Sequence, residues 1–101
     1  MKIDLTTGQQ QQILQLLADA MGTGIRVYAF GSRARGNARP FSDLDLLLDA
    51  NESIAYRDLA LASELLADTD LPFAVDLSDT SRLSEGFRHR IEADLIQIGV
   101  T

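Results

Sequence analysis

Two short motifs in the first half of the chain carry residue types suited to phosphate and metal chemistry. The first is Gly31-Ser32, which ends an apolar run and opens the stretch Gly-Ser-Arg-Ala-Arg-Gly. The second is the pair Asp43 and Asp45, which opens another apolar run. Glycine lets the backbone approach a phosphate closely, and the free N–H groups of a helical turn favour an anion. Together the two motifs predict a nucleotidyl-transfer site.

The spacing of Asp43 and Asp45 places both carboxylates on the same face of a strand. They repel each other unless solvent or a cation neutralises them, and Mg²⁺ prefers carboxylate oxygen. Such a site needs a third carboxylate on a neighbouring strand, and Asp76, in the apolar run 73–77, is in place to supply it. Three carboxylates can hold two ions that stabilise an in-line displacement. Alone, the pair would be read as two surface residues, but the Gly-Ser loop and Asp76 favour the metal site.

The net charge of -6 argues against broad nucleic-acid binding, which needs many basic residues. Arg33, Arg35 and Arg39 nevertheless fall close together, which suits a small polyphosphate. Two roles are equally expected for Arg35: contact with a triphosphate, or a salt bridge that braces the loop. Arg33 is expected to face solvent. The single histidine, His89, lacks metal-binding neighbours and is expected on the surface.

Length and composition place further bounds on the chain. Its 101 residues predict a single domain that spans 1–101. The absence of cysteine excludes a disulfide framework and a thiolate metal site. The sequence contains neither a membrane-spanning apolar run nor a signal peptide at its start, so a cytoplasmic location is expected.

The hydrophobic pattern predicts an α/β (α+β) domain in which helices flank a small mixed sheet of three or four strands. The expected elements are a helix capped by Thr6 or Thr7 that ends near Met21, a strand over 25–30, a loop over 31–42 with one helical turn after Ser32, a strand over 44–48, a helix over 54–67 capped by Ser53, a strand over 73–77, and a last helix from about residue 80 to Ile98. The second and third strands should be parallel because a helix joins them, whereas the tight loop makes the first two antiparallel.

The segments 31–36 and 42–46 together resemble the signature of the DNA-polymerase-β-like nucleotidyltransferase superfamily. Within that superfamily, the short chain and the Gly-Ser-x-Ala-Arg-Gly form resemble the minimal nucleotidyltransferases, the MNT group. The loop does not match the P-loop pattern G-x-x-x-x-G-K-[ST], which excludes a P-loop NTPase.

The resemblance implies a role for each residue of the two motifs. Asp43 and Asp45 would bind two Mg²⁺ ions, and Asp76 would be the third carboxylate, which helps to activate an acceptor hydroxyl. Gly31 and Ser32 would hold the β- and γ-phosphates of a nucleoside triphosphate, with ATP as the family's usual substrate.

The resemblance also implies a partner. MNT proteins are commonly paired with a helical HEPN protein in toxin–antitoxin modules, where the MNT protein is the antitoxin and in some cases transfers AMP to a HEPN tyrosine. Two alternatives remain open: an antitoxin that neutralises its partner by binding alone, and a small-molecule transferase of the antibiotic-modifying sort.

Overall fold

The computed structural model describes residues 3–101, so the first two residues of the predicted domain lie outside it. In chain order the elements are α1 (Thr7–Met21), β1 (Arg26–Phe30), α2 (Gly31–Arg35), β2 (Leu44–Asp49), α3 (Tyr56–Ala67), β3 (Val75–Asp79), a 3-10 turn (Thr80–Arg82), α4 (Glu85–Glu92) and β4 (Ile96–Val100). None of the helices in this part of the chain has the length and apolarity needed to cross a membrane.

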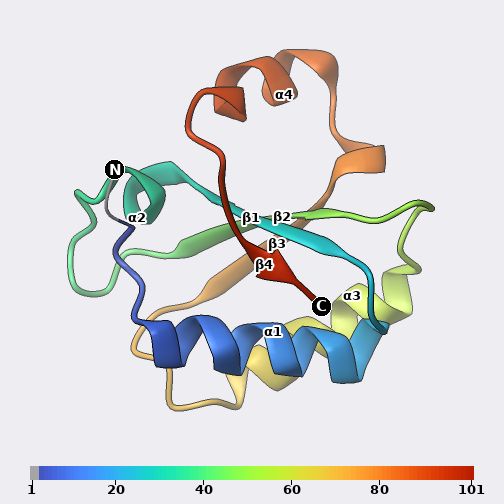
Figure 1. Cartoon of the computed structure of the whole chain (residues 1–101), viewed down its shortest axis with the longest axis horizontal. Helices are drawn as coiled ribbons and strands as arrows, with labels where there is room; N and C mark the ends of the chain where they lie inside the picture. Colours follow the sequence, from blue (N-terminus) through green and yellow to red (C-terminus); the bar gives the residue numbers. More distant parts are fainter. Residues whose placement is uncertain (1–2) are drawn as a thin grey trace.

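The strands form one mixed sheet in the order β3-β2-β1-β4 (Figure 1). β1 is antiparallel to both β2 and β4, and β2 is parallel to β3. The parallel and antiparallel pairings predicted from the connections are therefore confirmed.

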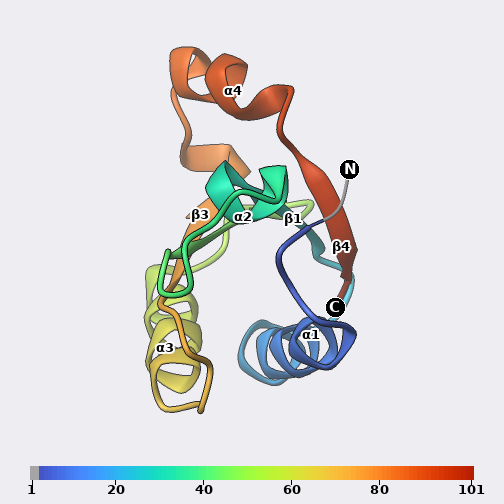
Figure 2. The same cartoon turned by 90° about the vertical axis from the view of Figure 1, so that its left-hand side faces the viewer.

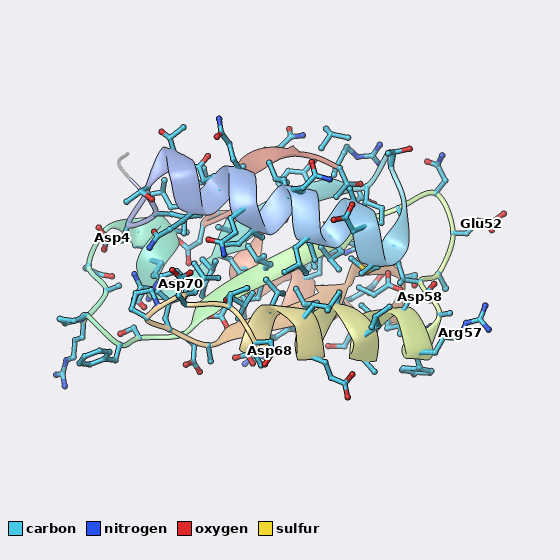
Figure 3. All side chains as sticks on the ribbon, turned by 90° about the horizontal axis from the view of Figure 1, so that it is seen from below. Asp4, Glu52, Arg57, Asp58, Asp68 and Asp70 are labelled. Atoms are coloured by element: carbon cyan, nitrogen blue, oxygen red, sulfur yellow. The ribbon has the colours of Figure 1, made fainter. Side chains whose placement is uncertain are left out.

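Helices cover the two faces of this sheet. Figure 2 shows α1 and α3 on one side and α4 on the other, and Figure 3 shows α1 and α3 side by side from below. Leu44, Leu46 and Leu48 are fully buried in the core cluster that includes residues of α1 and α3. The alternate residue Leu47 packs with Phe30 against α4. Because side chains alternate along a strand, Asp45 lies on the α4 face.

The first helix begins as predicted. Thr6 accepts a hydrogen bond from the Gln9 N–H, and the Gln9 side chain accepts one from the Thr6 N–H, so the two residues form a capping box. The cap predicted for the middle helix is wrong. Ser53 pairs with Ser81 at 2.8 Å, and Ala55 occupies the N-cap of α3 without a side-chain bond.

The C-terminal segment differs most from the sequence prediction, which extends a helix to Ile98. Instead, α4 starts after Ser84, which caps it through the Phe87 N–H, and ends at Glu92. Residues 96–100 then form β4, which pairs with β1. The alternating apolar residues Ile96 and Ile98 suit a strand, and backbone hydrogen bonds to β1 favour that conformation.

The third strand is displaced from its predicted range of 73–77. β3 starts at Val75, which pairs with Leu44 at the start of β2. It ends at Asp79, which pairs with Leu48. Phe73 lies before the strand and is buried in the core.

Asp79 organises the segment that leads into α3. Its carboxylate accepts hydrogen bonds from the Ile54 N–H at 2.8 Å and the Ser81 N–H at 3.0 Å, and it lies 3.5 Å from Arg82 Nε. Burial raises the pKa of Asp79, but these hydrogen bonds and the charge on Arg82 outweigh it and lower the pKa below its usual value. The charged carboxylate therefore stabilises the folded state.

We expect Asp79→Asn to lower the free energy of unfolding at neutral pH by about 1–3 kcal/mol, because a buried donor loses its partner. A lowered pKa gives stability that is present above the unfolded pKa of about 3.9 and is lost as the pH falls below it. The deficit of the variant should therefore shrink in acid. Urea unfolding across this pH range tests it, with the exposed Asp70→Asn as control; a deficit independent of pH would contradict the charge-based account.

Candidate active site

Three neighbouring strands bring the predicted residues to one end of the sheet. Gly31 follows directly on Phe30, the last residue of β1. Phe30 is paired with Asp45 of β2, and Asp45 is paired with Asp76 of β3. The Gly-Ser motif and two of the predicted carboxylates thus lie in one row across the sheet, although Asp45 and Asp76 are 31 residues apart in the sequence.

The backbone at Gly31 is fitted to the Asp45 carboxylate. Gly31 has a φ of +79°, and a Cβ atom on it would lie only 2.6 Å from Asp45 Oδ2. No L-residue could therefore replace Gly31 without strain in the backbone and displacement of the carboxylate. Ser32 is the second residue of α2, whose N-terminus has no side-chain cap.

The three predicted carboxylates act on one another electrostatically. Partial burial of Asp45 raises its pKa, and the negative charges of Asp76 and Asp43 raise it further. Asp43 and Asp76 are exposed to solvent, whereas Asp45 is half-buried. A cation placed among them would relieve this repulsion.

The donor set suits Mg²⁺, although it does not form a closed cage. Within residues 3–101, no three histidine, aspartate or glutamate side chains are grouped so that they could hold a metal ion. Mg²⁺ is usually bound through one or two carboxylates together with substrate phosphates and water. The half-buried Asp45 beside the Gly31-Ser32 turn fits that mode, in which a nucleotide would supply the remaining ligands.

The sequence predicts that Arg33 faces solvent, but the structure buries it, with 7% of its surface exposed. Its guanidinium donates hydrogen bonds to backbone carbonyl oxygens and lies 4.0 Å from the centre of the Phe73 ring. The prediction was wrong because carbonyl acceptors from a folded loop leave no trace in residue types.

Arg35 braces the molecule through a salt bridge. Its Nη1 lies 3.0 Å from Asp94 Oδ2, which joins α2 to the turn after α4. The bracing role that the sequence left open is thus present, and a contact between Arg35 and nucleotide stays a prediction. His89 is 82% exposed, as expected for a surface residue.

Comparisons with known proteins show which family and fold the chain shares. The family described as polymerase beta, nucleotidyltransferase matches residues 10–98. The probable protein adenylyltransferase MntA of Haemophilus influenzae is 34% identical over 83 residues, which cover 82% of this chain and 73% of that protein.

Solved structures show the same fold. A chain in a crystal structure of a toxin–antitoxin with AMP-PNP is similar with a TM-score of 0.76 and 25% identity, covering 91% of this chain and 73% of that one. A structure of tri-AMPylated Shewanella oneidensis HEPN toxin in complex with MNT antitoxin gives a TM-score of 0.68 at 22% identity, covering 91% and 70%. Since the family match spans most of the sequence, this chain belongs to the polymerase beta nucleotidyltransferase family.

Proposed function

We propose that this nucleotidyltransferase transfers AMP from ATP to a tyrosine hydroxyl of a HEPN-type partner, with Mg²⁺ as cofactor, and thereby acts as an antitoxin. The observation that carries the proposal is the row formed by Gly31, Asp45 and Asp76 at one end of the sheet. Its choice of AMP and of a protein acceptor is supported by the name of the Haemophilus influenzae relative. The choice of partner is supported by the fold shared with an MNT antitoxin bound to an AMPylated HEPN toxin.

In this proposal Gly31 and Ser32 hold the β- and γ-phosphates of ATP through backbone N–H groups and the serine hydroxyl, and Arg35 adds a charged contact. Asp43, Asp45 and Asp76, together with the phosphates of the bound nucleotide, would hold two Mg²⁺ ions, which when bound supply positive charge to the attacking and leaving oxygens.

The transfer itself is an in-line displacement at the α-phosphorus. The tyrosine oxygen forms the new bond to phosphorus, the bond to the bridging oxygen of the β-phosphate breaks, and pyrophosphate leaves. The phenolic proton passes to Asp76, whose exposed carboxylate is accessible to an acceptor from outside the chain.

The proposal is tested with ATP radiolabelled at the α-phosphate. We expect the acceptor to be a HEPN-type protein that is encoded beside this chain. Label should appear on the partner when ATP and Mg²⁺ are present, and less when the nucleotide is CTP, GTP or UTP. A partner that binds the chain but never acquires label would contradict the proposal.

A second candidate is an antitoxin that neutralises its partner by binding alone. The observation that favours it is the fold shared with an MNT antitoxin that is held in a complex with its HEPN toxin. Cells that express the partner distinguish the two. A chain with Asp43→Asn and Asp45→Asn should fail to protect them if transfer is required, and should still protect them if binding suffices.

A further inference from the structure

Arg33 is one of the two charged or polar side chains buried in the described part of the chain, and it meets the backbone rather than a carboxylate. Its guanidinium donates to the carbonyl oxygens of Ser42 at 2.8 Å, Pro40 at 2.9 Å, Asp4 at 3.2 Å and Arg39 at 3.4 Å. A buried cation whose partners are all neutral is costly unless each N–H finds an acceptor. The burial of Arg33 therefore indicates a role that an exposed, solvated arginine could not fill.

Three of those carbonyls belong to the loop that separates the phosphate motif from the carboxylates. Arg39 and Pro40 lie within this loop, and Ser42 immediately precedes Asp43. The loop is closed on itself as well, since the Arg39 N–H donates to Ser42 Oγ at 3.0 Å and the Ser42 N–H to the Arg39 carbonyl at 3.0 Å. The guanidinium thus fixes the backbone from which Asp43 projects.

The N-terminal segment closes the same loop through Asp4. Its N–H donates to the Arg33 carbonyl at 2.8 Å, and its carboxylate accepts from the Ala38 N–H at 3.0 Å. Figure 3 shows Asp4 beside α2 at this end of the molecule. Asp4 therefore ties α2 and the loop together from outside, while the Arg33 side chain ties them from within.

Arg33 also contacts Phe73, in the segment that leads to the third carboxylate, Asp76. The Arg33 guanidinium lies 4.0 Å from the centre of the Phe73 ring, three residues before Asp76. A single side chain thus contacts both segments that lead into the carboxylates, and it belongs to the same short helix as Gly31 and Ser32.

We propose that Arg33 is a positioning residue that holds Asp43 and Asp76 in register with the Gly31-Ser32 turn for metal-dependent nucleotidyl transfer, a role that rests on the function proposed above. Arginine suits it because the planar guanidinium presents five N–H donors in a fixed fork, whereas lysine has three donors on a single nitrogen. Loss of the guanidinium frees the loop carbonyls and lets the Asp43 backbone move, but leaves the phosphate turn itself intact.

The test compares Arg33→Met, Arg33→Lys and wild type, with Arg57→Met as control because the Arg57 side chain is 89% exposed. Binding of Mg²⁺ to each protein is measured by calorimetry in the presence of a non-hydrolysable ATP analogue. Transfer of labelled AMP to the HEPN-type partner is measured against Mg²⁺ concentration at saturating ATP, and against ATP at saturating Mg²⁺. We expect Arg33→Met to raise the half-saturating Mg²⁺ concentration by about 10- to 100-fold, the range typical of residues that orient metal ligands. The KM for ATP should change far less, Arg33→Lys should be intermediate, and Arg57→Met should match wild type.

A purely structural role would give a different result. Partial unfolding removes active molecules, which lowers kcat but leaves the half-saturating Mg²⁺ concentration of the remaining molecules unchanged. An unchanged Mg²⁺ dependence in Arg33→Met therefore overturns the positioning role, and if that variant does not fold, the same result in Arg33→Lys overturns it. If wild type and Arg57→Met both transfer no label, the proposed function fails and the role of Arg33 with it.

Discussion

Replacement of Asp43 and Asp45 together by asparagine is expected to reduce AMP transfer by on the order of 10³-fold or more, because charge stabilisation of the reacting oxygens is lost. Asparagine keeps the shape of each side chain and removes its charge. The rate of label transfer to the partner at saturating ATP and Mg²⁺ measures the effect.

The same double variant should be at least as stable as wild type. Burial and the charges of Asp76 and Asp43 raise the pKa of Asp45, so its ionised form opposes folding at neutral pH. Loss of the charge relieves that repulsion, and urea unfolding should show no decrease in stability. Loss of activity together with unfolding would not support the account.

The matched control is Asp68→Asn with Asp70→Asn. These two carboxylates are also two residues apart, but both are exposed and lie after α3 (Figure 3). This variant removes the same net charge and should transfer label at the wild-type rate. Similar rates for the two double variants would show that the charges at 43 and 45 have no special role.

A single methyl group at Gly31 is expected to have the second-largest effect on transfer. In Gly31→Ala the new Cβ atom would lie 2.6 Å from Asp45 Oδ2, and the φ of +79° is unfavourable for alanine. The Asp45 carboxylate must move or rotate. Displacement of a reacting group by about 1 Å can cost about 10²-fold in rate, and we expect a loss of that size.

Gly86→Ala provides the control for this variant. Gly86 lies in α4, has no unfavourable φ, and a Cβ atom there meets nothing within 4 Å. Alanine in a helix should stabilise the chain by about 0.5–1 kcal/mol and leave transfer unchanged. Full activity in Gly31→Ala would contradict a functional role for the close approach of Gly31 to Asp45.

Local patterns were sufficient to predict most of the fold. The capping box at Thr6 and Gln9, the apolar runs of β1 and β2, and the pairing that follows from the connections all depend on neighbouring residues. The C-terminal strand could not be predicted in this way. Apolar residues around Ile96 continue the helical spacing of α4 as well as they fit a strand, and only backbone pairing with the distant β1 decides between them.

The candidate site likewise has features that the sequence predicts and contacts that it does not. Strand alternation and the order of the strands were enough to place Asp45 and Asp76 side by side, because the sheet has a fixed geometry. The environment of Arg33 depends on carbonyl oxygens of a folded loop, and the partner of Arg35, Asp94, is 59 residues away. Neither contact leaves a signal in the types or spacing of nearby residues.

The most direct test of the central claim is the intact mass of the HEPN-type partner after incubation with this chain, ATP and Mg²⁺. The account predicts that the partner gains the mass of one or more AMP groups, that fragmentation places them on tyrosine, and that the Asp43→Asn, Asp45→Asn variant leaves the mass unchanged. A partner that binds the chain yet keeps its original mass, or that is modified equally by the double variant, would contradict it.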